Sequence, residues 1–264
     1  MQKNLSPEIE ITPHTLLLNA SISIVIPIYN IQNKLSYSLR KIREAVEPYF
    51  RDYELIAVND GSTDHTLAVL REIESTDEEK RLRVLSYSPN RGKGYAVRYG
   101  VLHSRGDIVM YLDGDLDISP ELIKEYVEKL STSDLVIGSK RHPKSNITIP
   151  RSRKFLSRAF NVITRMTIGI SQKDTQVGFK AGNGEIMRRI FKKARIKRYA
   201  FDVELLTIAS ILHLKVQEMP VIMTIERKFN TKEIVKMFLD VIRIWYNYRV
   251  AHRYHHESLE KEII

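Results

Sequence analysis

Short β-branched runs alternate with helix-length segments through the first half of this chain, and that alternation constrains its fold more than any other feature. The runs that predict strands occupy residues 21–28, 53–59, 82–86, 107–112 and 135–138. The intervening segments that predict helices occupy residues 34–49, 63–74, 93–104 and 120–130. Strands linked by helices form a mainly parallel sheet with helices on both faces. The sequence therefore predicts an α/β fold.

The residues directly after each predicted strand are polar, as expected of a binding site. Ligands of such sheets bind beyond the carboxyl ends of the strands. The polar residues there are Tyr29-Asn30, Asp60-Gly61-Ser62 and Asp113-Gly114-Asp115. Ser62 or Thr63 is the predicted N-cap of the following helix.

Composition allows one large globular domain and narrows the chemistry. The 264 residues are 43% hydrophobic and include no Cys. Disulfides, thiolate metal sites and Cys nucleophiles are thereby excluded, so any metal must bind to oxygen or imidazole. The formal charge of +10 indicates an anionic partner, which can be nucleic acid, a membrane surface or a phosphorylated substrate.

The positive charge is concentrated in two acid-free segments. Residues 135–173 hold nine bases, and residues 186–201 hold seven. The rest of the chain has 26 bases and 32 acids, so an acidic body carries a basic face. A simple solvated surface is the alternative interpretation, and it applies more readily to the second segment.

Three carboxylates follow the predicted strand at 107–112, namely Asp113, Asp115 and Asp117. Carboxylates two residues apart on an extended turn can face one space, where Mg²⁺ or Mn²⁺ relieves their repulsion and leaves positions open for phosphates. The alternative is a hydrophilic turn whose Asp side chains cap the helix beginning at Pro120. The segment 90–94 (NRGKG) lacks the full Walker pattern, although Lys93 at a glycine-flanked helix start suits a diphosphate.

Six segments together resemble the family 2 glycosyltransferases of the GT-A fold. They are SISIVIPIYN (21–30), ELIAVNDGSTD (54–64), NRGKGYAVRYG (90–100), DIVMYLDGDLD (107–117), DTQVGFKA (174–181) and FDVELL (201–206). The resemblance covers residues 21–225 and is strongest to the branch of dolichyl-phosphate β-glucosyltransferase and dolichol-phosphate mannose synthase. It implies an inverting, metal-dependent hexosyltransferase that uses a nucleotide sugar, either UDP-glucose or GDP-mannose, with glucose favoured.

The resemblance also implies roles for individual residues. The nucleotide sugar is expected at Pro27, Tyr29, Asn30, Asp60, Gly61, Ser62, Lys93 and Asp113. The metal, Mg²⁺ or Mn²⁺, is expected at Asp113, Asp115 and Asp117, and the catalytic residues are expected to be Asp115, Asp174 and Asp202.

The acceptor determines what further groups are needed. A dolichyl or polyprenyl phosphate is already anionic near neutral pH, because the second pKa of a phosphate monoester is about 6. It needs cations rather than a base, and the resemblance implies that Arg141, Arg151, Arg153 and Arg158 of the first acid-free segment bind it. The alternative acceptor is a hydroxyl of a glycan, protein or small molecule, for which Asp202 would act as general base. A nucleic-acid-binding protein is a remote alternative, and no nucleic-acid partner is expected.

The chain ends in a segment with its own pattern. Residues 1–20 are predicted to be an extension, 21–230 the GT-A domain, 231–254 an amphipathic helix and 255–264 a polar tail. The helix suits the headgroup level of an anionic membrane; packing on its own domain, or on a second copy in a homo-oligomer, is the alternative. No stretch has the 18 apolar residues of a transmembrane segment. The predicted location is cytoplasmic, at the cytoplasmic face of a membrane.

Overall fold

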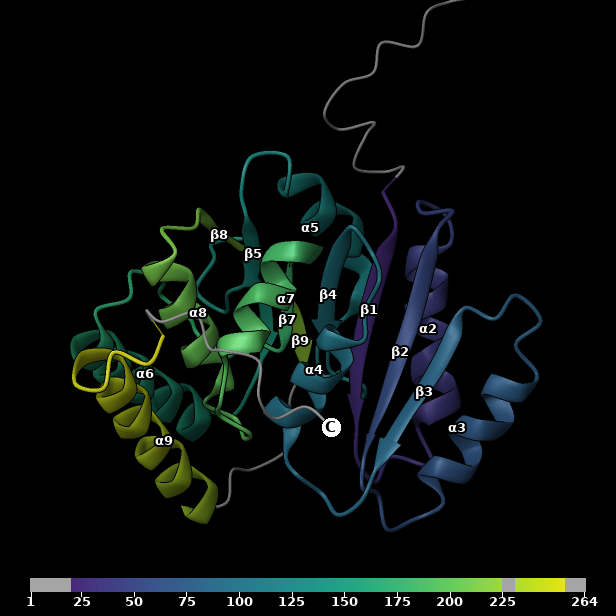
Figure 1. Cartoon of the computed structure of the whole chain (residues 1–264), viewed down its shortest axis with the longest axis horizontal. Coiled ribbons are helices and arrows are strands. Elements are labelled where there is room, and N and C mark those ends of the chain that lie inside the picture. Colours follow the sequence, from purple (N-terminus) through teal and green to yellow (C-terminus); the bar gives the residue numbers. More distant parts are fainter. Residues whose placement is uncertain (1–19, 225–230, 255–264) are drawn as a thin grey trace, which may run out of the picture.

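The computed structural model describes residues 20–224 and 231–254, which contain one seven-stranded sheet (Figure 1). The strand order is β3-β2-β1-β4-β7-β5-β8. All neighbours run parallel except β7, which is antiparallel to both β4 and β5. The strands are β1 (Ile22–Ile28), β2 (Tyr53–Asp60), β3 (Leu82–Tyr87), β4 (Ile108–Leu112), β5 (Leu135–Gly138), β7 (Phe179–Asn183) and β8 (Val216–Met219). The mainly parallel sheet and its first five strands are therefore confirmed.

Helices cover both faces of the sheet in a three-layer arrangement. One face packs on α2 (Leu35–Val46), α3 (Thr66–Ser75) and α5 (Ile123–Lys129), the last preceded by a 3₁₀ turn (Pro120–Leu122). The other face packs on α4 (Lys93–Leu102), α6 (Arg151–Ile168), α7 (Gly184–Lys193), α8 (Phe201–Ile211) and α9 (Thr231–Arg249). Two short strands, β6 (Asn146–Thr148) and β9 (Ile222–Thr224), pair separately.

Central strand β1 shows why these sequences form buried strands. Successive side chains of a strand point to opposite faces of the sheet. Ile24 and Ile26 therefore enter the core beneath α2, while Val25 enters the core beneath α4. A strand covered on both faces must be apolar almost throughout, which accounts for the unbroken hydrophobic run.

The predicted cap of α3 is wrong. Neither Ser62 nor Thr63 caps the helix, which begins at Thr66, and the Asp64 carboxylate accepts a hydrogen bond from the Thr66 amide at 3.0 Å. The Ser62 hydroxyl instead accepts a hydrogen bond from the Asn30 amide at 3.1 Å. The loop runs three residues further than expected because it bridges to the end of β1.

Helix α9 packs on α6 and α8 of the same chain through Met237, Val241 and Ile244, which are buried. The segment predicted as a separate helix thus shares the core, although Leu239 and Ile242 on its other face are more than half exposed. Within the described residues, no helix has the length and apolar character needed to cross a bilayer. The predicted extension and polar tail fall on residues 1–19 and 255–264, outside the described residues.

Candidate active site

A cavity of about 540 Å³ opens at the carboxyl ends of β1, β2 and β4, and α6, α8 and α9 contribute to its far side. This is where a doubly covered parallel sheet binds ligands. The charged side chains that line the cavity are Asp60, Arg91, Lys93, Asp113, Asp115, Asp117, Lys140, Arg198, Asp202, Lys236 and Asp240. Acids and bases thus meet in one space although they are spread over most of the sequence.

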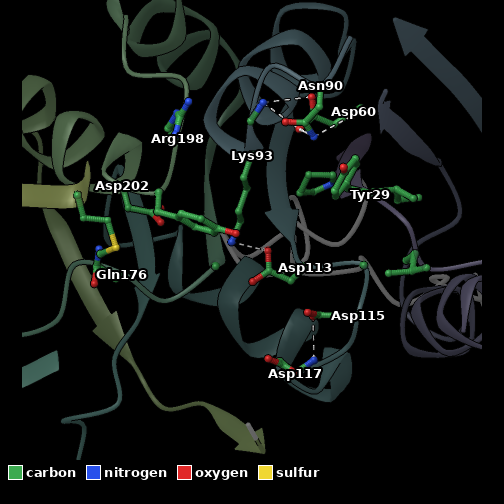
Figure 2. A pocket seen from close by; sticks show the side chains of 18 of the residues that line it. Tyr29, Asp60, Asn90, Lys93, Asp113, Asp115, Asp117, Gln176, Arg198 and Asp202 are labelled. Carbon is green, nitrogen blue, oxygen red and sulfur yellow. Dashed lines mark hydrogen bonds and ion pairs between the residues drawn. The ribbon is translucent and has the colours of Figure 1, made fainter. Parts of the chain in front are cut away.

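The Asp60 carboxylate organises the loop that leads into α4. Its Oδ1 accepts hydrogen bonds from the Arg91 amide at 2.7 Å and the Tyr87 hydroxyl at 2.9 Å. Its Oδ2 accepts from the Asn90 side chain at 2.9 Å and the Gly92 amide at 3.0 Å (Figure 2). Asp60 therefore fixes the wall of the cavity as well as lining it.

The expected nucleotide residues divide into two groups. Pro27, Tyr29, Asp60, Lys93 and Asp113 line the cavity. Asn30, Gly61 and Ser62 are not among its lining residues, and they join the neighbouring loops instead. The Asn30 side chain bonds to Thr63. Gly61 has a φ of +62° and lies where a Cβ would come within 2.5 Å of the Asn90 amide nitrogen.

Lys93 and Asp113 form an ion pair at the centre of the site, with 2.5 Å between Nζ and Oδ1 (Figure 2). Lys93 opens α4, and Asp113 directly follows β4. Burial raises the pKa of Asp113, and the negative charge of Asp115 adds to the rise, against the lowering effect of Lys93. Burial lowers the pKa of Lys93, but the charges of Asp113 and Asp202 outweigh it and leave the pKa raised. Lys93 is therefore a cation.

The three carboxylates predicted to bind a metal ion are not gathered into a ready-made cluster in the described part of the chain. Asp113, Asp115 and Asp117 all line the cavity, but among the described residues no three His, Asp or Glu side chains gather closely enough to hold a metal ion. Asp113 turns towards Lys93, and Asp115 accepts a hydrogen bond from the Asp117 amide at 3.2 Å (Figure 2). The donor set still fits a divalent cation, because the charges of Asp115 and Asp202 both disfavour ionisation of Asp113.

Asp202 lies in the first turn of α8, and two buried side chains hold its carboxylate in place. Its Oδ1 accepts hydrogen bonds from the Tyr111 hydroxyl and from Lys180 Nζ, each at 2.6 Å. Lys180 is 1% exposed, and its Nζ also donates to the Val177 carbonyl at 2.6 Å. Burial lowers the pKa of Lys180, although the charge of Asp202 opposes this shift. The Tyr111 and Lys180 side chains thus fix Asp202 at the cavity wall.

The third expected catalytic residue, Asp174, does not reach the cavity. It is fully buried and holds Lys140, accepting hydrogen bonds from the Lys140 amide at 2.8 Å and Nζ at 3.0 Å. Burial raises the pKa of Asp174, but the charge and hydrogen bonds of Lys140 outweigh it and leave the pKa lowered. Lys140 lines the cavity, as does Gln176, whose amide also donates to Asp174, so Asp174 acts on the site through these two residues.

The four arginines predicted to bind the acceptor stay a prediction, since those whose side chains are described do not line the cavity. Arg141 and Arg158 are not among the lining residues of the cavity, and the side chains of Arg151 and Arg153 lie outside those described. One guanidinium nitrogen of Arg141, Nη2, is buried and has no hydrogen-bond partner in the described part of the chain. Besides Arg91 and Lys93, the bases that line the cavity are Lys140, Arg198 and Lys236.

Those three bases were missed for different reasons. Lys140 carried a usable signal, because it follows the carboxyl end of predicted strand 135–138 within the first basic segment. Arg198 was one of seven similar bases, and Lys236 lies on a helix 96 residues beyond Lys140. Only tertiary packing brings Lys236 to the sheet edge.

Gly178 allows the centre of the site to close up. A Cβ at this position would lie 2.7 Å from the Asp113 carboxyl carbon and 2.7 Å from Lys93 Nζ. These distances are shorter than van der Waals contact, so any larger residue would displace the ion pair. The close approach of Asp113 and Lys93 thus explains why position 178 is a glycine.

Comparisons with known proteins agree with this geometry. The model of the family "Glycosyl transferase family 2" matches residues 23–194. The chain is 32% identical to dolichyl-phosphate beta-glucosyltransferase ALG5C of Trichomonas vaginalis over 86% of this chain and 71% of that protein. It is 31% identical to dolichyl-phosphate beta-glucosyltransferase of Drosophila melanogaster over 93% of this chain and 79% of that protein.

A solved structure shares the fold. Glucosyl-3-phosphoglycerate synthase from Mycobacterium tuberculosis, in complex with Mn²⁺, UDP and glucosyl-3-phosphoglycerate, superposes with a TM-score of 0.62 at 21% identity. The match covers 92% of this chain and 86% of that one. The fold is GT-A, as the sequence predicted. The chain belongs to glycosyl transferase family 2. It is a glycosyltransferase, similar in sequence to the enzymes that carry the name dolichyl-phosphate beta-glucosyltransferase.

Proposed function

We propose that this chain transfers glucose from UDP-glucose to dolichyl phosphate or a related polyprenyl phosphate, with inversion at the anomeric carbon. The observation that carries the proposal is one cavity lined both by the acids Asp113, Asp115 and Asp202 and by the bases Lys140, Arg198 and Lys236. The names of the relatives support the choice of glucose and of the lipid acceptor.

The residues suit the two halves of the reaction. An oxygen of the lipid phosphate attacks the anomeric carbon, and the bond from that carbon to the diphosphate breaks, releasing UDP. Lys93 lies where it can neutralise charge on the leaving group. A Mg²⁺ or Mn²⁺ ion held by Asp113 and Asp115 would supply further positive charge to that diphosphate. Mn²⁺ and UDP in the solved synthase support this cofactor.

The acceptor phosphate calls for cations rather than a base. At neutral pH it is already an anionic nucleophile, since its second pKa is about 6. Lys140, fixed by Asp174, and Arg198 both line the cavity and can bind such an anion there. The basic start of α6 extends the positive field outward, with Arg158 exposed one residue beyond cavity-lining Ser157.

Reversing two charges on α6 tests the acceptor. In the double variant Arg151→Glu/Arg158→Glu, we expect KM for dolichyl phosphate to rise at least tenfold, because repulsion replaces attraction for the anionic acceptor. UDP affinity should stay within twofold. Kinetics in detergent micelles and UDP titration measure the two quantities, with exposed Arg189→Glu as the control. An unchanged KM in the double variant would argue against a phosphate acceptor that binds beside α6.

We further propose that adjacent helices α6 and α9 present a membrane-binding surface (Figure 1). Its exposed apolar side chains are Val162, Ile163 and Met166 of α6, and Leu239, Ile242, Trp245 and Tyr246 of α9. Exposed bases accompany them, including Arg165 and Arg243. Apolar side chains that insert into a bilayer, with bases around them, suit the anionic cytoplasmic leaflet of a membrane. A lipid phosphate in that leaflet would then reach the cavity.

One substitution tests this surface. Ile242 is 58% exposed, so Ile242→Glu should leave the core intact while placing a negative charge against anionic lipid. We expect sedimentation with phosphatidylserine vesicles to fall at least fivefold and UDP binding to be unchanged. Tyr37→Glu, at a 53% exposed aromatic residue on α2, is the matched control. Equal sedimentation of the Ile242→Glu variant and the wild type would contradict the proposal.

A further inference from the structure

Asp240 on α9 carries an unused hydrogen-bond acceptor in the cavity. The residue lines the cavity together with Lys236 and Met237, so α9 forms part of the site as well as part of the core. Its Oδ2 atom is buried and has no hydrogen-bond partner among the described residues. Buried carboxylate oxygens are almost always paired, because an unpaired one loses its hydration without compensation. A hydrogen-bond donor on a bound ligand would supply the missing partner.

Nearby bases do not fill that role. Burial raises the pKa of Asp240, and the charges of Arg198 and Arg243 lower it only in part. Neither base lies within ion-pair distance of Asp240 in the described structure. The two arginines bias the carboxyl group towards its anionic form without occupying Oδ2.

The chemistry of the reactants selects the partner. Phosphates are acceptors and anions, so a carboxylate repels both the diphosphate and a lipid phosphate. The uracil and ribose of the donor carry hydrogen-bond donors, but the loops proposed to hold the nucleotide, with Tyr29 and Asp60, come from β1 and β2. Asp240 lies near Arg198, whose charge acts on it, and Arg198 packs against Gly92, next to the Lys93 that is proposed to meet the diphosphate. The remaining donors are the hydroxyl groups of the transferred sugar.

We infer that Asp240 accepts a hydrogen bond from a hydroxyl of the donor's hexose and is a specificity-determining residue of the transferase. The inference rests on the proposed function and deepens it, because it assigns the C-terminal helix a part in sugar selection. In this assignment Lys140 and Arg198 bind phosphate, and the Asp240 carboxylate binds the sugar.

Two ligands separate this role from a structural one. In Asp240→Asn, which keeps the side-chain shape, we expect affinity for UDP-glucose to fall about tenfold, because a hydrogen bond to a charged acceptor becomes one to a neutral amide oxygen. The affinity of the variant for UDP, which lacks the hexose, should stay within twofold of the wild-type value. Calorimetric titration with Mn²⁺ present measures both, with Asp52→Asn on the exposed surface as control.

Deoxy donors then identify the hydroxyl. For the analogue of UDP-glucose that lacks the hydroxyl bound by Asp240, the wild type and Asp240→Asn should have equal affinity, because the lost interaction is the same. The inference would be overturned if the variant bound UDP-glucose as tightly as the wild type, or if it lost affinity for UDP to the same extent as for UDP-glucose. It would also be overturned if the affinities of variant and wild type differed for every one of the 2-, 3-, 4- and 6-deoxy donors. A wild-type chain that bound UDP but no UDP-glucose would contradict the proposed function itself.

Discussion

Replacing Asp115 by asparagine is expected to lower the turnover of glucose transfer by about a hundredfold to a thousandfold, the size of effect seen when one charge-stabilising group is removed from an active site. Asp115 lines the cavity beside Asp113, and its negative charge helps to raise the pKa of that neighbour. Removing the charge relieves this repulsion but weakens the proposed divalent-cation site. The leaving diphosphate then loses its electrostatic support.

The measurement compares turnover, UDP affinity and folding of the same variant. Titration of Mn²⁺ in the presence of UDP should show weaker metal binding in Asp115→Asn, and circular dichroism should show an unchanged fold. Asp107→Asn is a matched control, because Asp107 directly precedes the same strand and its side chain bonds to Ser21 at the opposite end of the strand from the cavity. Wild-type turnover in Asp115→Asn would exclude the role proposed for this carboxylate.

The second large effect concerns the buried base beneath Asp202. Lys180→Met should lower the free energy of unfolding by about 3–5 kcal/mol, since removal of one partner from a buried ion pair leaves the other charge uncompensated. Lys180 and Asp202 have side chains only 1% and 4% exposed, and their charged atoms lie 2.6 Å apart. Transfer activity should fall as well, because Asp202 would lose the contact that holds it at the cavity wall.

A double variant separates stability from chemistry. In Lys180→Met/Asp202→Asn the buried charge is gone, and the Tyr111 hydroxyl can still donate to the amide oxygen at position 202. Stability should recover most of the loss, whereas activity should not recover. Urea unfolding and turnover assays measure the two. If the free energy of unfolding of Lys180→Met lay within 1 kcal/mol of the wild-type value, the ion pair would not be needed to balance the buried charge.

Local patterns predicted the parts of the fold that local physics determines. The apolar runs of β1, β2 and β4 must be buried on both faces, and the polar residues that follow them must meet at one sheet edge. Asp60, Asp113 and Asp115 were found in this way, and all three line the cavity. Antiparallel β7 was missed because its sequence FKAGN has a charged and a polar residue among few apolar ones.

Residues brought to the site by long-range packing left no local signal. Lys236 and Asp240 look like ordinary polar positions of an amphipathic helix, and only the docking of α9 on α6 and α8 turns them into the cavity. Asp174 shows the opposite case. Its motif predicted a place in the active site, but packing buries it behind Lys140. Glu204 also turns away, accepting the Ile196 amide at 2.7 Å and the Tyr254 hydroxyl at 2.6 Å.

The most direct test of the central claim is transfer of labelled glucose into an organic-extractable product. The wild-type chain is incubated with UDP-[¹⁴C]glucose, Mn²⁺ and dolichyl phosphate, beside Asp115→Asn and beside reactions with chelator or with dolichol lacking the phosphate. The account predicts extractable label only with the wild type, metal and dolichyl phosphate together. Label transferred only to a water-soluble acceptor, or equally by wild type and Asp115→Asn, would contradict it.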